Sequence, residues 1–295
     1  MNATRQAPFL PKLWTVLREG YRPADFRHDA MAGLTVAIVA LPLAMALAIA
    51  SGTTPDKGLV TAVVAGFLIS ALGGSRFQIG GPTGAFIPVV YTVIATHGYD
   101  GLVLATLMAG VMLIAAGLLK TGTLMRFMPQ PLVTGFTSGI AVIIATSQLK
   151  DALGLDVAKV PAEFLPKLRV LAAHLGETDP WALGMAAASV ALIAGLRRWA
   201  PLAPGFLLAV LAAAGATALW QLPVDTIGSR FGGIPSSLPM PHWPAVSVDR
   251  MVALLPSALT IAFLAAIESL LSAVVDDGMS GGKHRPNTEL VAQGI

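Results

Sequence analysis

A break near the start of a long apolar run limits how this chain can fold. No charged residue occurs between Arg76 and Asp100, yet a Gly-Gly-Pro sequence stands at 80–82. Proline inside a helix lacks the backbone N–H and clashes with the preceding turn, but it is well tolerated at the first helical position. The sequence therefore predicts an extended entry over 77–81 and a helix from Pro82 to about Thr96.

The predicted helix is too short to cross a membrane. About 15 residues span about 22 Å at 1.5 Å per residue, whereas the hydrocarbon core is about 30 Å thick. We therefore expect the helix to begin inside the membrane, with the N–H groups of Thr83, Gly84 and Ala85 unpaired. The start of a helix attracts anions, and broken helices that point at a mid-membrane substrate are typical of transporters.

The composition is that of an all-α, polytopic membrane protein. The 295 residues are 55% hydrophobic and 12% charged, with a mean hydropathy of +0.73, whereas soluble domains carry about 25% charged residues. The chain has no cysteine, which excludes disulfides and thiol chemistry, and its five histidines lack metal-ligand spacing. No P-loop, G-x-S-x-G or GxGxxG pattern occurs, so we expect neither an enzyme nor a bound cofactor or metal.

Lysine and arginine predict the orientation. Residues 1–30 are mixed and basic without an apolar core, which indicates a cytoplasmic segment and not a signal peptide. With the N-terminus inside, the cytoplasmic segments hold 12 Lys and Arg and the outer segments hold 7. The pI near 9.4 then reflects basic residues that flank apolar segments, and no nucleic-acid partner is expected. The pattern predicts a multi-pass protein of the cell membrane.

Charge-free apolar stretches predict eight membrane segments. They cover about 31–51, 58–74, 82–96, 101–119, 129–149, 180–196, 201–222 and 251–275. The long connection over 150–179 has the pattern of a short amphipathic helix at about 162–175. Small residues let membrane helices approach closely, and five glycines fit that role: Gly66, Gly110, Gly117, Gly135 and Gly139.

Glu268 is the one acidic residue well inside a predicted span. A carboxylate at that depth costs about 2.5–3.5 kcal/mol on insertion scales, so it faces the bundle interior, water or a cation, or it is protonated. Glu268 is thus a candidate proton carrier or cation ligand, and the alternative is a helix–helix hydrogen bond without a transport role. Ser272 lies on the same face at i+4, whereas Ser269 points about 100° away.

Two further positions admit a functional and a structural interpretation. The hydroxyl of Thr83 could contact an anion at the helix start or cap that helix. Pro42 lies near the middle of the first span and predicts a kink or an unwound turn there. Its neighbourhood could line a substrate site or be a tolerated kink.

Four ordered motifs make the chain resemble the SulP sulfate permease family. These are DAMAGLTVAI at 29–38 with LPLAMA at 41–46, GGSR at 73–76 with GGPTGA at 80–85, FMPQPLVTGFTSG at 127–139, and NTELVAQGI at 287–295. The resemblance implies two inverted repeats of seven segments that are sorted into a core and a gate domain. It assigns 31–119 to core segments 1–4, 129–222 to gate segments 5–7, and 251–295 to segment 8 and the start of segment 9.

The resemblance also implies a site and a mechanism. It predicts a secondary anion transporter that moves core against gate as an elevator, with sulfate as the default substrate and bicarbonate or a dicarboxylate as further candidates. The anion site would use Gly81, Thr83, Gly84 and Ala85 of segment 3 and Pro42, Leu43 and Ala44 of segment 1. Glu268 and Ser272 would serve symport with a proton or sodium ion. Family members often dimerise, and a STAS domain usually follows the membrane part.

The sequence stops at Ile295, inside the ninth-segment motif. We therefore expect a truncated transporter domain, in which the second half of the anion site is missing. Two alternatives stay open at this point. One is a nucleobase permease of similar 7+7 fold, and the other is a fragment that does not transport.

Overall fold

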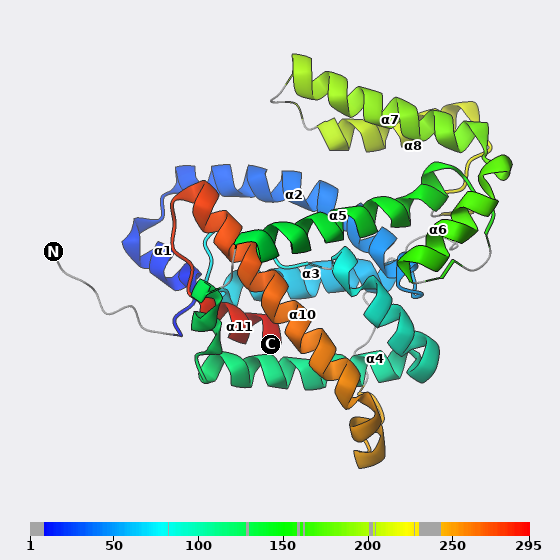
Figure 1. Cartoon of the computed structure of the whole chain (residues 1–295). Helices are drawn as coiled ribbons and strands as arrows, with labels where there is room; N and C mark the ends of the chain where they lie inside the picture. The colour runs from blue at the N-terminus through cyan, green and yellow to red at the C-terminus, as the bar shows by residue number, and fades with distance from the viewer. Residues whose placement is uncertain are drawn as a thin grey trace.

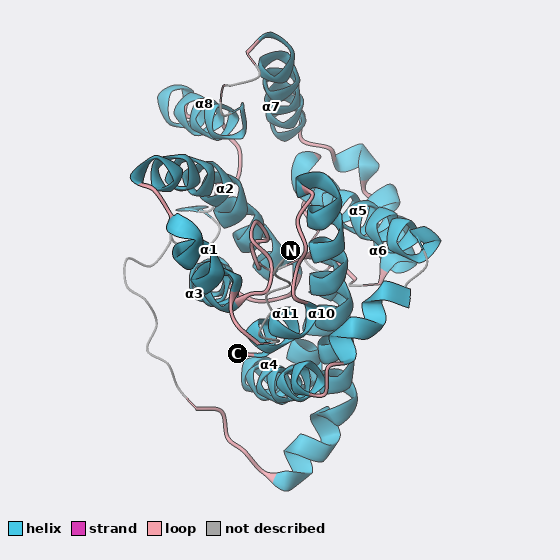
Figure 2. Cartoon of the chain, turned by 90° about the vertical axis from the view of Figure 1, so that its left-hand side faces the viewer, coloured by secondary structure: helices cyan, strands magenta, loops and turns pink. Residues whose placement is uncertain are grey.

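The computed structural model describes residues 9–81, 83–127, 130–157, 160–161, 163–200, 203, 205–226, 228–229 and 243–295. Helices make up the regular structure of this part, and no strand occurs in it (Figure 2). The all-α prediction is therefore confirmed for the described residues. Pro82, Met128 and Pro129, where two predicted spans begin, lie outside them.

The helices follow one another along the chain as coloured in Figure 1. Their bounds are α1 Lys12–Gly20, α2 Pro23–Ala50, α3 Pro55–Leu72, η1 Gly84–Phe86, α4 Ile87–Leu118, η2 Thr121–Phe127, α5 Gln130–Ala152, α6 Phe164–Ala173, η3 Leu175–Glu177, α7 Pro180–Trp199, α8 Gly205–Trp220, α10 Val248–Ser280 and α11 Pro286–Gly294. The amphipathic helix predicted at 162–175 is confirmed as α6.

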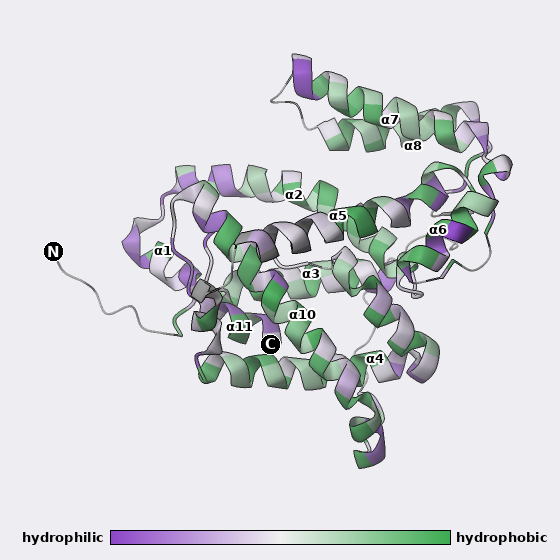
Figure 3. Cartoon of the chain, viewed as in Figure 1, coloured by the Kyte–Doolittle hydropathy of each residue, from purple (hydrophilic) through white to green (hydrophobic). Residues whose placement is uncertain are grey.

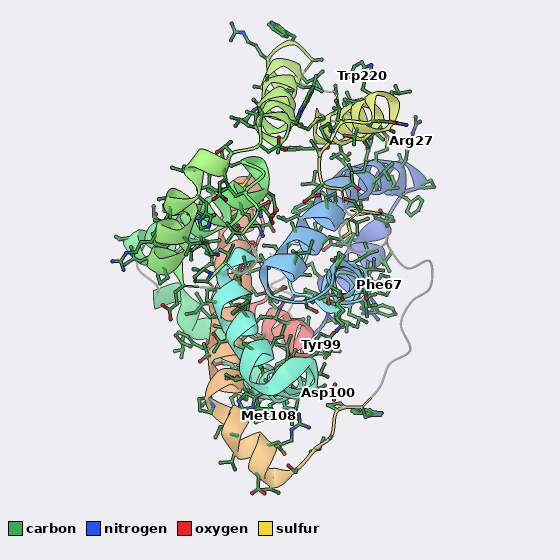
Figure 4. All side chains as sticks on the ribbon, turned by 90° about the vertical axis from the view of Figure 1, so that its right-hand side faces the viewer. Arg27, Phe67, Tyr99, Asp100, Met108 and Trp220 are labelled. Atoms are coloured by element: carbon green, nitrogen blue, oxygen red, sulfur yellow. The ribbon has the colours of Figure 1, made fainter. Side chains whose placement is uncertain are left out.

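Five helices of the described part are long and apolar enough to cross a membrane: α2, α3, η1 with α4, α7 and α10. Large apolar side chains remain exposed on them and on the shorter α8, for example Phe67 and Trp220, which point outward (Figure 4). Polar residues concentrate at α1 and at the ends of the longer helices (Figure 3). Such apolar exteriors suit a lipid environment. The count of eight spans stays a prediction.

The predicted spans 82–96 and 101–119 are two arms of one helical element. Gly98 has φ 69° and ψ −179° inside α4, a conformation in which the chain bends sharply. A left-handed φ of this kind strongly favours glycine, since other side chains clash there. Figure 1 shows the two arms of α4 running in different directions. The first arm, with η1, carries the short helix predicted after the Gly-Gly-Pro break.

Pro42 does not unwind α2. The helix continues from Pro23 to Ala50 with Pro42 inside it. Because proline has no N–H, the carbonyl of Ile38 loses its usual helical partner, but the turns on either side persist. Of the two outcomes predicted at this position, the unwound turn is therefore excluded, and the kink stays a prediction.

The packed centre of the chain joins α4, α10 and α11. Buried apolar side chains on these helices form one cluster, which includes Leu104, Leu113, Leu254, Ile261, Leu270 and Leu290. α11 lies between α10 and α4 (Figure 1), and α2 packs along α3. α7 and α8 pair with each other at the edge of the molecule. The C-terminal helices thus pack against α4, which lies in the first half of the chain.

Close helix approach explains two of the five glycines singled out in the sequence. A Cβ at Gly110 would lie 2.5 Å from the carbonyl oxygen of Gly294, and a Cβ at Gly117 would lie 2.6 Å from Val291. Both contacts join α4 to α11. In contrast, no described atom lies within 4 Å of a Cβ at Gly135 or Gly139, so the close approach predicted there is absent.

The α4–α11 contact gives a stability prediction. Gly110→Ala places a methyl group against the backbone of α11, so we expect overpacking to cost about 1–3 kcal/mol and to lower the melting temperature in detergent. Gly139→Ala is the matched control, because its Cβ meets no neighbour and alanine favours helix by up to about 1 kcal/mol. Equal melting temperatures for the two variants would contradict the close approach.

Candidate functional site

The two features that stood out in the sequence meet in the structure. The hydroxyl of Thr83 donates a hydrogen bond of 2.8 Å to a carboxylate oxygen of Glu268, 185 residues away. Thr83 ends the extended entry before η1, and Glu268 lies on α10. The carboxylate of Glu268, which is costly to place in a membrane, therefore contacts the start of the broken helix.

Thr83 does not use its side chain to cap the helix. It occupies the N-cap position with extended backbone angles, φ −129° and ψ 160°, but its hydroxyl makes no capping hydrogen bond. Capping would turn that hydroxyl toward the N–H groups of the first turn. Its bond to Glu268 shows that the side chain faces α10 instead, so the capping alternative is wrong in this structure.

In the described part, two backbone donors of the first turn have no hydrogen-bond partner. Gly84–Phe86 form a 3₁₀ turn in which the N–H of Phe86 donates to the carbonyl of Thr83 at 3.3 Å. Within the described part, the N–H groups of Gly84 and Ala85 make no hydrogen bond. Unpaired N–H groups at a helix start attract negative charge. They lie next to Thr83, beside the carboxylate of Glu268.

Close packing requires the small residues around this turn. Gly84 is buried, and a Cβ there would lie 2.4 Å from Ile144 of α5. A Cβ at Gly80 would lie 2.5 Å from Ile69 of α3. The extended entry is thus pressed against α3, and the helix start is pressed against α5, whereas Gly81 is exposed between them.

Ser269 lies next to the site, although the helical spacing placed it on another face than Glu268. It is 5% exposed, and the side-chain amide of Gln78 donates to its carbonyl oxygen at 3.0 Å and to its hydroxyl at 3.4 Å. Ser272, the residue chosen from its i+4 spacing, is exposed. Its predicted role in ion coupling stays a prediction, while the buried polar contacts belong to Ser269.

Residues 42–44 lie apart from the hydrogen bonds of the site. Ala44 is 1% exposed and packs against α3, where a Cβ at Gly58 would lie 2.3 Å from its carbonyl oxygen. Leu43 is exposed, and Pro42 is partly exposed. No hydrogen bond in the described part joins these residues to Thr83 or Glu268. Their contact with a substrate stays a prediction.

The described part of the chain shows no cluster of metal-binding side chains at the site. In the described ranges, no group of three or more His, Asp or Glu side chains could hold a metal ion. The groups that converge on the helix start are two backbone N–H groups, one hydroxyl and one carboxylate. Such a set can bind an anion, and it can bind a proton or a hard cation through its oxygens.

Comparison with known proteins identifies the family of this chain. Residues 26–295 match the sulfate permease family, which is nearly the whole chain. The chain belongs to the sulfate permease family. The resemblance inferred from the four sequence motifs is therefore confirmed, and members of this family are transporters and not enzymes.

Relatives in the sulfate permease family include sulfate and bicarbonate transporters. The chain is 44% identical to the putative sulfate transporter YvdB of Bacillus subtilis over 278 residues. The matched region covers 94% of this chain and 52% of YvdB. It is 32% identical to the bicarbonate transporter BicA of Picosynechococcus sp. over 286 residues. That region covers 92% of this chain and 49% of BicA. The chain thus spans about half the length of these relatives.

Solved structures of the family share the fold. The transmembrane domain of a cyanobacterial bicarbonate transporter, BicA, matches with a TM-score of 0.75 at 32% identity, over 89% of this chain and 68% of that domain. The anion transporter SLC26A9 matches with a TM-score of 0.76 at 18% identity, over 97% of this chain and 49% of its own. The chain therefore shares the helical membrane fold of the part of these transporters that it covers.

Proposed function

We propose that this chain belongs to a secondary active transporter of inorganic anions. The observation that carries the proposal is the hydrogen bond from Thr83 to Glu268 at the start of a broken helix. It places an ionisable group of α10 beside the first N–H groups of this helix, which favour an anion. Sulfate is the first candidate substrate because YvdB, the relative with 44% identity, is named a putative sulfate transporter. Bicarbonate follows from BicA, and a dicarboxylate is a third candidate.

The geometry suggests how a second ion would be coupled. An ionised Glu268 would repel an anion at the helix start, since two like charges about 4 Å apart repel by about 4 kcal/mol at an effective dielectric constant of about 20. A proton or sodium ion on Glu268 removes that repulsion. Binding of the cation and of the anion would then favour each other, which is the requirement for symport.

The hydroxyl of Thr83 adds to this coupling. In the structure it donates its single proton to Glu268, so it cannot donate to an anion at the same time. When Glu268 is protonated, its own O–H can donate to the Thr83 oxygen, and the Thr83 proton becomes free for the anion. With sodium, the oxygens of Glu268 and Ser272 would be the ligands.

The architecture of the family supplies the remaining part of the proposal. α2, α3, α4, α10 and α11 would form the core that carries the anion, and α5, α7 and α8 would belong to the gate. The core would move against the gate as an elevator in the cell membrane, with the N-terminus in the cytoplasm. The packing of α10 and α11 on α4 and of α7 on α8 supports this grouping, and the contacts of α5 with η1 and of α2 with α8 would lie where core and gate meet. A homodimer is the assembly that we propose.

Transport by the intact protein tests this function. We expect purified protein in proteoliposomes to accumulate labelled sulfate or bicarbonate when an inward proton or sodium gradient is imposed. Uracil and xanthine are the comparison substrates, since a nucleobase permease would take them up instead. Nucleobase uptake without anion uptake, or no flux under either gradient, would overturn the proposal.

A further inference from the structure

The motif at the C-terminal end of the sequence contains a buried carboxylate that the anion site does not use. Glu289 lies on α11 and is 1% exposed, which makes it one of the most buried large side chains of the described part. A carboxylate at such a position needs hydrogen-bond donors to offset the loss of water. The hydrogen-bond partners of Glu289 therefore indicate the role of its side chain.

Both carboxylate oxygens of Glu289 have partners far away in the sequence. One oxygen accepts hydrogen bonds from the backbone N–H groups of Gly74 at 2.7 Å and Ser75 at 3.2 Å. The other accepts from the hydroxyl of Ser269 at 3.3 Å. The N-cap residue of α11 adds a backbone contact, because the N–H of Arg285 donates to the carbonyl of Gly74 at 2.9 Å. Glu289 thus connects the turn after α3 to α10.

Ser269 extends the connection to the broken segment. Its carbonyl and hydroxyl oxygens accept from the amide of Gln78, and it directly follows Glu268 on α10. The amide orientation is fixed by chemistry, since a carbonyl can only accept and Gln78 must present its NH₂ group. The segment that precedes Thr83 is therefore held at Gly74 and Ser75 by α11 and at Gln78 by α10. The hydroxyl of Ser75 adds a second bond to α10, because it donates to Asp276 at 2.7 Å.

The held segment has little regular structure of its own. Residues 73–81 and Thr83 belong to no helix, so their backbone lacks the regular hydrogen bonds that fix a helix. The position of Thr83 relative to Glu268 then depends on side-chain tethers at the entry. Sites that need a defined geometry are held by such supporting hydrogen bonds.

We propose that Glu289 is a positioning residue for the candidate anion site. Its carboxylate holds the turn at Gly74 and Ser75, and through Ser269 it holds Gln78, so that the broken segment presents Thr83 to Glu268. The inference rests on the proposed function only in naming the site as an anion site. The tether itself is defined by the hydrogen bonds of Glu289.

The positioning role depends on hydrogen-bond acceptors and not on charge. In Glu289→Gln the amide oxygen can still accept from the two N–H groups, and the amide NH₂ can donate to Ser269, whose hydroxyl is able to accept. In Glu289→Ala the N–H groups of Gly74 and Ser75 lose their partner. Glutamine should therefore retain the tether, and alanine should remove it.

Two measurements on the intact protein test the inference. The first is the affinity for sulfate and bicarbonate by titration of wild type, Glu289→Gln, Glu289→Ala and the control Glu177→Ala, an exposed carboxylate. We expect Glu289→Ala to weaken affinity about tenfold and Glu289→Gln and Glu177→Ala to stay within about twofold of wild type. Ser269→Ala removes the hydroxyl between Glu289 and Gln78 and leaves the Gln78 bond to the backbone carbonyl of residue 269. It should weaken affinity about threefold and carries the test if Glu289→Ala does not fold.

The second measurement does not depend on anion binding. Because the chain has no cysteine, a single Ile79→Cys reporter in the held segment can be labelled selectively. We expect thiol labelling to be about fivefold faster with Glu289→Ala than without it, and unchanged with Glu289→Gln, because loss of the tether frees the segment.

The outcomes separate this inference from the proposed function. Unchanged affinity and labelling in Glu289→Ala would overturn the positioning role, and so would an equal loss in Glu289→Gln, which would indicate a role for the charge. If the wild type binds neither anion while labelling still responds to Glu289→Ala, the proposed function fails and the tether stands.

Discussion

Glu268→Gln is expected to abolish gradient-driven anion uptake in the intact protein. Glutamine has nearly the same shape and can still accept the hydrogen bond from Thr83, but it can neither take up a proton nor supply a negative oxygen to sodium. Anion binding is then no longer linked to the second ion. Accumulation of labelled sulfate or bicarbonate under a proton or sodium gradient should fall to the passive level. Each tenfold drop in the inside-to-outside concentration ratio corresponds to about 1.4 kcal/mol of lost driving force.

A matched substitution and a second assay make this result specific. Glu163→Gln removes an exposed carboxylate outside the spans and should leave accumulation as in wild type. Anion exchange at equal concentrations on both sides should persist in Glu268→Gln, since exchange needs the anion site and not the coupling. Unchanged ion-dependent uptake in Glu268→Gln would show that the Thr83–Glu268 bond is only a helix–helix contact.

Thr83→Val is expected to weaken anion affinity by about tenfold to a hundredfold. Valine keeps the shape of threonine but removes the hydroxyl, and a hydrogen bond to a charged group contributes about 1.5–3 kcal/mol. It also leaves Glu268 without the donor that it has in the structure. Direct binding titrations with sulfate and bicarbonate measure the change in the dissociation constant.

Thr83→Ser is the conservative partner of this variant. Serine retains a hydroxyl at the same place, so we expect an affinity close to wild type. If Thr83→Val binds the anion as well as wild type does, the hydroxyl serves Glu268 alone and the anion is held by backbone N–H groups without it.

The helices and the unusual positions could be predicted from local chemistry. Proline at 82 excludes a helix interior, and a carboxylate at 268 is costly in an apolar span, wherever the rest of the chain lies. For the same reason α6 was predicted from its own periodicity, and its bounds, Phe164–Ala173, fall inside the expected range. These properties belong to segments of about ten to thirty residues.

The prediction was less successful where it needed to know what a helix faces. The i+4 rule places Ser272 on the face of Glu268, but it does not say that α11 would approach α10 on the side of Ser269. Gly135 and Gly139 have the same size as Gly110 and Gly117, yet only the latter pair meets a neighbouring helix in the described part. Residue type allows close approach without requiring it.

The sequence by itself determined that this is a helical membrane protein with a broken segment and one costly carboxylate, because backbone geometry and transfer into hydrocarbon act locally. Only the tertiary structure decided that Thr83 faces Glu268 and that Glu289 holds the segment that precedes Thr83. These contacts join residues that are 185 and 215 positions apart in the sequence. Such contacts depend on the packing of α4, α10 and α11, and a one-dimensional pattern contains no information on which faces meet.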